Sequence, residues 1–277
     1  MLLLAALIVG LLLFPAWLGD AQETASFGET RPLLIVMYHS VLKDPARAGA
    51  YVVSPETVRS DIARLQALGY TCVLPSEAIA FVRDGGALPE KPVLITFDDG
   101  HLNNLTYVLP ILEALDAKAL INAVGAYTDR FTDQPDPNPN YAYLSWDQLE
   151  ELAASGRVEI GNHSYNLHGQ SPRKGILPLP GEDPAAYRNL LTGDLGRMEA
   201  LLSNRGLSKG VFAYPFGAMD RQSAELVSAL GFSMTLTCRE QISTLQAGNL
   251  KSLLGLGRYN RPSGPSSFAF FDEILKG

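Results

Sequence analysis

The sequence is poor in cysteine and histidine. It contains 2 cysteines and 4 histidines among 277 residues. The cysteines, Cys72 and Cys238, allow at most one disulfide bond, which an exported protein could form. Each lies in an apolar run, "YTCVL" and "MTLTC", and this setting favours buried free thiols.

Positive charge is also scarce. The chain carries 22 Lys and Arg against 29 Asp and Glu, a formal net charge of −7, and it has no basic run. A nucleic-acid partner therefore has no electrostatic support. A composition of 47% hydrophobic and 18% charged residues is typical of a soluble globular protein.

The first 19 residues, "MLLLAALIVGLLLFPAWLG", form an almost unbroken apolar run. Such a run is typical of a secretory signal or a short membrane anchor. No clear cleavage site follows it, so both alternatives stay open for residues 1–25. We expect export to the cell envelope or the extracellular space, as a secreted or membrane-anchored protein. Residues 26–277 are then the folded domain.

Short apolar runs alternate with amphipathic stretches along the rest of the chain. Runs of this kind, rich in β-branched residues, are typical of strands buried on both faces. The predicted strands are 33–39, 70–74, 92–97, 119–124, 157–162, 210–215 and 232–237, with a weaker eighth in 252–259.

Three predicted helices, 54–69, 145–156 and 220–231, each begin at a capping residue and end at a glycine before the next strand. This alternation indicates a parallel α/β fold, most simply a (β/α) barrel. A doubly wound sheet is the alternative, although no glycine-rich phosphate loop follows the first strand. Two Pro-rich stretches, 128–143 and 170–187, are predicted as long loops over a functional face.

Polar residues follow three of the predicted strands. His39 ends the first, Asp98 and Asp99 end the third, and His163 ends the fifth, with His168 shortly after it. Active sites of parallel α/β folds lie at the carboxyl ends of strands. Adjacent carboxylates on a strand point to opposite sides, which predicts different roles for the two aspartates. One Asp and two His would make a three-ligand metal site with open positions.

Three segments resemble, in order, the motifs of the NodB-type polysaccharide deacetylases, carbohydrate esterase family four. They are "ITFDDG" (95–100), "WDQLEELAASGRVEIGNHSYNLH" (146–168) and "FAYPFG" (212–217), and the resemblance covers roughly residues 32–262. It implies a single-domain distorted (β/α) barrel, a divalent metal held by Asp-His-His, and hydrolysis of N-acetyl groups on amino-sugar polymers.

The resemblance also implies roles for individual residues. Asp98 matches the catalytic base, and Asp99, His163 and His168 match the metal ligands. Tyr214 and Phe216 lie in the motif that forms one wall of the substrate groove, and the backbone near Phe216 would supply an oxyanion N–H. Zinc is the expected metal, with cobalt, nickel or iron as alternatives.

The chain departs from the family pattern at two places, and in each the role of the missing residue must be taken by another one. Ala213 stands where the family has an arginine, and Arg258 and Arg261 are the candidates to replace it or to bind substrate. The late Leu-x-His motif, the usual source of the general acid, is missing. In the branch that resembles the poly-N-acetylglucosamine deacetylases, a histidine of an N-terminal "MYH" strand takes that role, which makes His39 the expected acid.

We therefore expect a metal-dependent hydrolase that removes N-acetyl groups from an extracellular polymer of the N-acetylglucosamine type. It acts on a carbon–nitrogen but not a peptide bond, and its partner is a polysaccharide, with membrane contact through the N-terminal segment. The oligomeric state stays undetermined. Two alternatives share the same residues: a glycan-binding protein that has lost catalysis, and an O-acetyl esterase.

Overall fold

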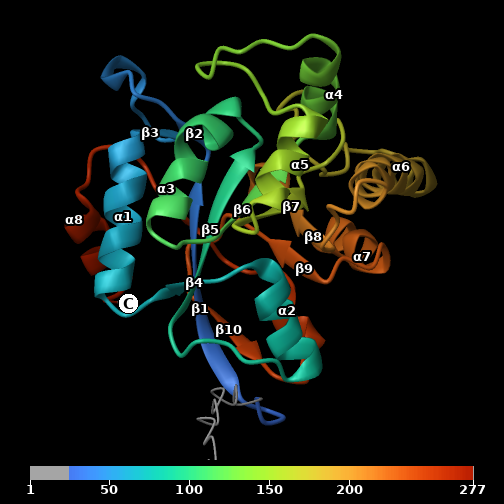
Figure 1. Cartoon of the computed structure of the whole chain (residues 1–277). Helices are drawn as coiled ribbons and strands as arrows, with labels where there is room; N and C mark the ends of the chain where they lie inside the picture. Colours follow the sequence, from blue (N-terminus) through green and yellow to red (C-terminus); the bar gives the residue numbers. More distant parts are fainter. Residues whose placement is uncertain (1–24, 277) are drawn as a thin grey trace, which may run out of the picture.

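A computed structural model describes residues 25–276 (Figure 1). Up to residue 24, the predicted signal or anchor lies outside the described residues, so it stays a prediction. Within the described part, no helix is both long and apolar enough to cross a membrane.

The strands are β1 (Thr30–Tyr38), β2 (Ser40–Val41), β3 (Val52–Val53), β4 (Thr71–Cys72), β5 (Pro92–Asp99), β6 (Ala119–Ala123), β7 (Val158–Asn162), β8 (Val211–Ala213), β9 (Met234–Leu236), β10 (Ser243–Gln246) and β11 (Tyr259–Asn260). The α-helices are α1 (Pro55–Ala67), α2 (Pro75–Asp84), α3 (Leu109–Ala114), α4 (Gly125–Asp133), α5 (Trp146–Ala154), α6 (Pro184–Ser203), α7 (Arg221–Ala229) and α8 (Ser267–Ile274).

The main sheet has the strand order β10-β1-β5-β6-β7-β8-β9, and its neighbours are parallel except for the β10–β1 pair. The sheet curls, and the segment 254–261 spans the space between its two ends. Leu256 bridges to Leu236 beside β9, and Tyr259 of β11 pairs with Val36 of β1. The predicted (β/α) barrel is thus confirmed in a distorted form, closed by a thin strand-like segment.

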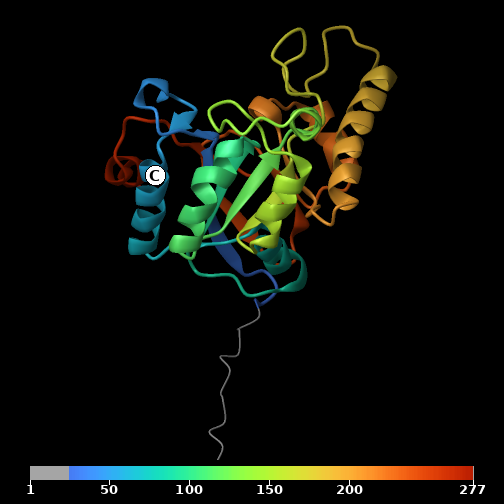
Figure 2. The same cartoon turned by 45° about the horizontal axis from the view of Figure 1, so that its top comes forward.

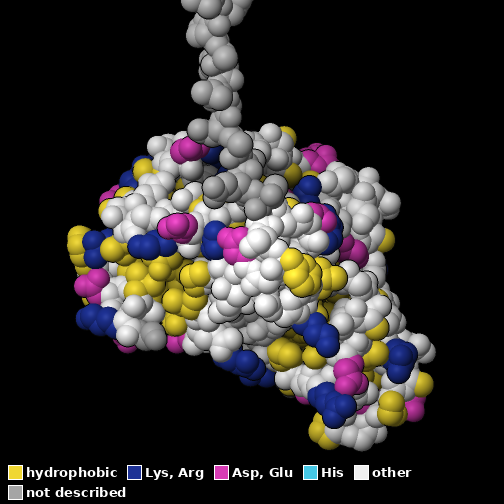
Figure 3. Space-filling model, turned by 90° about the horizontal axis from the view of Figure 1, so that it is seen from below, with side chains coloured by type: hydrophobic (Ala, Val, Ile, Leu, Met, Phe, Trp, Pro, Cys, Tyr) yellow, Lys and Arg dark blue, Asp and Glu magenta, His cyan; other side chains and the backbone are white. Residues whose placement is uncertain are grey.

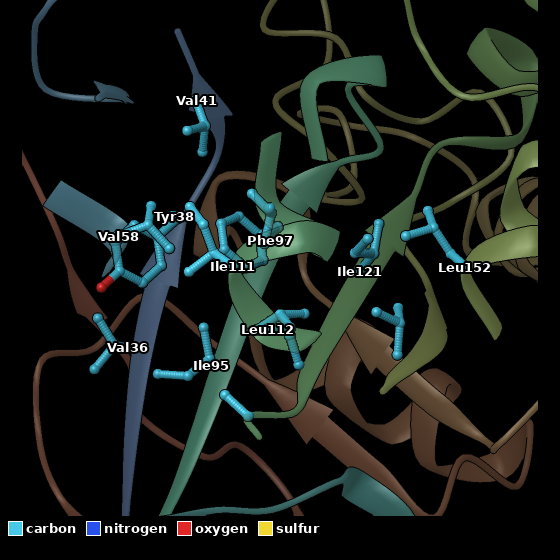
Figure 4. Packing of buried hydrophobic residues seen from close by; sticks show 14 of the residues in the cluster. Val36, Tyr38, Val41, Val58, Ile95, Phe97, Ile111, Leu112, Ile121 and Leu152 are labelled. Atoms are coloured by element: carbon cyan, nitrogen blue, oxygen red, sulfur yellow. The ribbon is translucent and has the colours of Figure 1, made fainter. Parts of the chain in front are cut away.

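Strand residues alternate between two hydrophobic clusters, as the period of two in a β-strand requires. Along β1, Leu34, Val36 and Tyr38 pack outward into a cluster that also includes residues of α1, α3 and α5 (Figure 4). Leu33 and Ile35 point inward to the barrel interior, where residues of α2 complete the packing. Inward positions near the carboxyl ends of the strands are therefore the ones that face the mouth of the barrel.

The predicted helix caps are present. The Ser54 hydroxyl accepts the Thr57 N–H at the start of α1, and Asp220 caps α7 in the same way with Ser223. Ser145 and Gln148 form a reciprocal capping box at α5. Because each cap satisfies N–H groups that a helix leaves free at its first turn, local sequence defines these starts.

The structure corrects the sequence predictions at three points. Of the predicted strand 252–259, only Tyr259 is in a strand, because Leu250–Leu253 form a 3-10 helix and a turn follows. The antiparallel strand β10 was missed, since its residues "STLQ" carry little apolar signal. The predicted loops are shorter than expected: residues 128–133 belong to α4, and α6 begins at Pro184.

The two ends of the barrel differ in their loops and surface side chains. The loops after β6, β7 and β8 rise above the carboxyl ends of the strands, with α6 at one side (Figure 2). The opposite end shows acidic and basic side chains interspersed with apolar ones (Figure 3). The polar residues singled out in the sequence lie at the loop-covered end.

Candidate metal centre and active site

Asp98 and Asp99 end β5, and both carboxylates reach the same site. Thr96 and Asp98 occupy inward positions of the strand, and Asp98 is 2% exposed. Asp99 would point outward by strand alternation, but its φ of 73° lies in the left-handed region and turns it to the mouth. The expectation that the aspartates face opposite sides is therefore wrong. Positive φ at a non-glycine residue costs energy and is common at functional sites.

His163 and His168 approach Asp99 from the end of β7 and the loop beyond it. The Asp99 Oδ1 atom lies 3.1 Å from His168 Nε2 and 3.7 Å from His163 Nε2. The other ring nitrogen of His163, Nδ1, is 2.8 Å from the carbonyl oxygen of Ala213. Since a carbonyl only accepts, Nδ1 carries the proton and the Nε2 lone pair faces Asp99.

These three residues fit a divalent cation. Their ligand atoms all lie within 4.8 Å of one another. Asp99 Oδ1 is buried and has no hydrogen-bond partner among the described residues. Burial lowers the pKa of His163 to about 4, which keeps its ring neutral as metal ligation requires. An orphaned carboxylate oxygen beside two imidazoles is the donor set of a catalytic zinc-type site.

Asp98 has a different environment from Asp99. The guanidinium of Arg258 donates to both of its carboxylate oxygens, each at 2.8 Å, and the Asn122 side-chain amide donates to Oδ1 at 2.7 Å. Burial opposes ionisation, but the charge of Arg258 and its hydrogen bonds outweigh it. The pKa of Asp98 therefore lies well below its usual range, and the carboxylate is ionised.

Arg258 reaches Asp98 because of how the barrel closes. It lies on the segment between β9 and β11, and its Nε donates to the Thr237 carbonyl at 2.9 Å. Its side chain is fully buried. Of the two candidates for the missing arginine, Arg258 is the one that the structure places against Asp98.

A glycine makes room for the second partner of Asp98. A Cβ on Gly161 of β7 would lie 2.2 Å from Asn122 Oδ1. No residue with a side chain fits there without moving Asn122. Gly161 thus permits the amide of Asn122 to reach Asp98 from the neighbouring strand.

His39 follows β1 directly and lies in the same cavity. The cavity has a volume of about 640 Å³ and includes both aspartates, His163 and His168. The ring of His39 meets that of Tyr51 edge-on, with centroids 4.8 Å apart. Burial lowers the pKa of His39, while the carboxylates of Asp98 and Asp99 act in the opposite direction.

Phe216 lines this cavity too. Its φ is 58°, again in the left-handed region, and its ring lies 4.7 Å from that of His168 between centroids. A Cβ on Gly175 would meet the Pro215 carbonyl oxygen at 2.8 Å, so the loop 169–182 packs closely behind the Phe216 turn.

The structure does not bring two of the predicted substrate residues to the cavity. Tyr214 is 2% exposed and packs against Phe212, since strand alternation turns it to the helix-covered face. Arg261 is 1% exposed, and its Nε donates to Asp61 Oδ2 at 2.8 Å. The prediction that they contact substrate was wrong, because each side chain is satisfied within the core.

His101 is not among the site residues predicted from the sequence, but it lies beside the candidate metal centre. Its Nε2 is 3.5 Å from Asp99 Oδ2, and its ring stacks on Tyr143 with centroids 4.8 Å apart. In the sequence, the position of His101 two residues after Asp99 could have indicated that it lies near the site. Cys72 and Cys238 are both free thiols, in line with the expectation from their apolar runs.

A curled parallel sheet with Asp, His, His and a second, ion-paired Asp at its carboxyl edge defines an α/β barrel with a candidate mononuclear metal centre. Residues 85–235 match the polysaccharide deacetylase family model, and the chain belongs to that family.

Several known proteins are similar to the chain. It is 29% identical over 260 residues to a poly-beta-1,6-N-acetyl-D-glucosamine N-deacetylase of Escherichia coli strain K12, a match that covers 87% of this chain and 38% of the relative. Among solved structures, IcaB from Ammonifex degensii is 27% identical with a TM-score of 0.68, and the match covers 86% of this chain and 94% of that one. A de-N-acetylase from Aggregatibacter actinomycetemcomitans has a TM-score of 0.72 at 24% identity, over 87% of this chain and 99% of that one, and shows the same fold.

Proposed function

We propose that the chain is a metal-dependent hydrolase that removes N-acetyl groups from a polymer of the N-acetylglucosamine type. The observation that carries the proposal is the convergence of three elements in one cavity: the Asp99–His163–His168 centre, the ionised Asp98, and His39. The similarity to the Escherichia coli poly-beta-1,6-N-acetyl-D-glucosamine N-deacetylase supports the polymer class.

Each residue has a defined task in amide hydrolysis. Asp98, held in place by Arg258 and Asn122, takes a proton from the attacking water. The main-chain N–H of Phe216 donates to the oxygen that becomes negative when the carbonyl is attacked. His39 delivers a proton to the sugar nitrogen, so that the amine leaves and acetate is released.

Asp99, His163 and His168 would hold the metal ion, for which zinc is preferred and cobalt, nickel and iron are alternatives. When bound, such an ion acts as a Lewis acid that polarises a carbonyl and acidifies water. The surroundings suit this chemistry, since His163 is 2% exposed and Asp98 lies directly beside it, with 3.9 Å between Nε2 and Oδ2.

We infer an extracellular or cell-envelope location, because the polymers of this class are outside the cell and the first 19 residues are apolar. The N-terminal segment then acts as a secretion signal or as an anchor. The partner is the polysaccharide itself.

The test is acetate release from N-acetylglucosamine oligomers by the purified chain from residue 26 onward. We expect release with added Zn²⁺, none after treatment with a chelator, and recovery when the metal is returned. The isosteric variant Asp98→Asn should turn over about 10²- to 10⁴-fold more slowly, as expected for loss of a positioned base. Asp272→Asn, a change at a half-exposed surface carboxylate (51% exposed), is the matched control.

Two results would contradict the proposal. Normal turnover by Asp98→Asn would remove Asp98 from the role of base. Release from an O-acetylated sugar but not from the N-acetylated oligomers would make the chain an esterase that uses the same site.

A further inference from the structure

The imidazole of His39 makes few contacts that would fix its position. Its Nδ1 is buried without a hydrogen-bond partner among the described residues. Its ring meets edge-on only the ring of Tyr51 among the described aromatic residues, and Tyr51 is itself 60% exposed. The position of the ring therefore depends on where the main chain places residue 39.

That main chain is held by two buried asparagines, Asn103 and Asn104, which are 1% and 0% exposed. The side-chain amide of Asn104 donates to the carbonyl oxygen of His39 at 3.2 Å. Asn103 accepts the N–H of Val41 at 2.9 Å and donates to the Ser40 hydroxyl at 3.0 Å. The two side chains are also joined to each other, at 3.2 Å.

These asparagines lie a few residues after Asp98 and Asp99. Asn104 begins a π-helix, Asn104–Val108, a rare conformation that is frequent at functional sites. The two consecutive side chains contact the main chain at His39 and the residues of β2 (Ser40–Val41). One short segment, 98–104, thus carries the base and a metal ligand and also fixes the main chain of the expected acid.

We propose that Asn103 and Asn104 are positioning residues for His39, which set its distance from Asp98 and Asp99 through the main chain of residues 39–41. The inference rests on the proposed function only for its effect on turnover. The geometric part, that the asparagines place the His39 ring, stands without it.

The first test measures the ring itself. The chain has four histidines, so their imidazole signals can be assigned by NMR from single His variants. Asn104→Leu keeps the branched shape of the side chain but removes the donor to His39, and Asn104→Ala removes it without added bulk. We expect either variant to shift the His39 ring signals and leave those of His163 and His168 in place. Unchanged His39 signals in a folded variant would overturn the inference.

The second test asks whether the placement matters for turnover. Asn104→Leu alone should lower kcat about 10- to 100-fold, the size of effect expected for a misplaced catalytic group, and leave zinc affinity unchanged. In a His39→Ala background the same change should lower kcat less than about 2-fold, because the group that it positions is gone. An equal loss in both backgrounds would mean a general structural effect and would overturn the proposal.

A control separates loss of stability from loss of position. Ser223→Ala removes a buried hydroxyl that caps α7, away from the cavity, and should leave kcat unchanged. If His39→Ala itself keeps full turnover, the proposed role of His39 fails, while the ring signals still decide the role of the asparagines.

Discussion

Arg258 and Asp98 form a bidentate ion pair in which both N–O distances are 2.8 Å, although the residues are 160 positions apart in the chain. Neither side chain is more than 2% exposed. The pair links the last part of the barrel to the end of β5. It also keeps a carboxylate ionised in a place where burial alone would favour the protonated form.

Arg258→Met should destabilise the protein by about 3–5 kcal/mol, because it leaves Asp98 as an unpaired buried charge. The double variant Asp98→Leu with Arg258→Met should recover most of that loss, since no buried charge remains. Urea unfolding of the two single variants, Arg258→Met and Asp98→Leu, and of the double variant measures these values. A double variant as unstable as the sum of the single changes would show that the pair contributes packing rather than charge compensation.

His101→Phe should weaken metal binding. Phenylalanine keeps the stacking on Tyr143 but removes the nitrogen that lies 3.5 Å from Asp99 Oδ2. Groups that orient a metal ligand are typically worth about 10- to 100-fold in affinity. Calorimetric titration with Zn²⁺ gives the dissociation constant, and an unchanged value would exclude an orienting role for His101.

Gly161→Ala should destabilise the barrel by about 1–3 kcal/mol, as expected for overpacking of a tight interior. The new methyl group would displace Asn122, whose amide contacts Asp98. Gly193→Ala is the matched control: it lies within α6 and nothing is within 4 Å of its added Cβ, so it should stabilise by roughly 0.5–1 kcal/mol. Thermal unfolding of both variants and of the parent protein tests whether the two changes in the free energy of unfolding have opposite signs.

The two thiols should differ in reactivity. Burial raises the pKa of Cys72 to about 11 and leaves the residue 6% exposed, so at pH 8 little thiolate is available to a reagent. Cys238 is partly exposed and lines the cavity. We expect iodoacetamide to modify Cys238 first, as read by mass spectrometry of the native protein. Faster modification of Cys72 would mean that the strand pair β4–β5 opens readily.

Much of the site could be predicted because its residues follow strands that are easy to identify. Asp98, Asp99 and His163 come directly after apolar runs, and parallel strands bring their carboxyl ends to one edge. His39 was placed there by the same argument. The helix caps were predictable for a similar reason, since Ser54 and Ser145 bond to N–H groups only three residues away.

Other features depend on contacts that the sequence does not display. Arg258 and Arg261 lie three positions apart in one segment, yet one pairs with Asp98 and the other with Asp61. Only the path of the closing segment decides between them. Tyr214 belongs to a recognisable motif, but the pleat of β8 turns its ring away from the cavity. The strand β10 was missed because an antiparallel edge strand needs no continuous apolar run.

The order in which the barrel is made has a consequence for its maturation. A ribosome releases β1, β5, β6 and β7 well before residue 258 is synthesised, so Asp98 lacks its guanidinium partner until the segment 254–261 joins the sheet. Until then, burial of the ionised Asp98 carboxylate is unfavourable, and we expect the mouth of the barrel to stay open to solvent. The buried environment of Asp98 is therefore complete only after the segment that carries Arg258 has been synthesised and has folded onto the sheet.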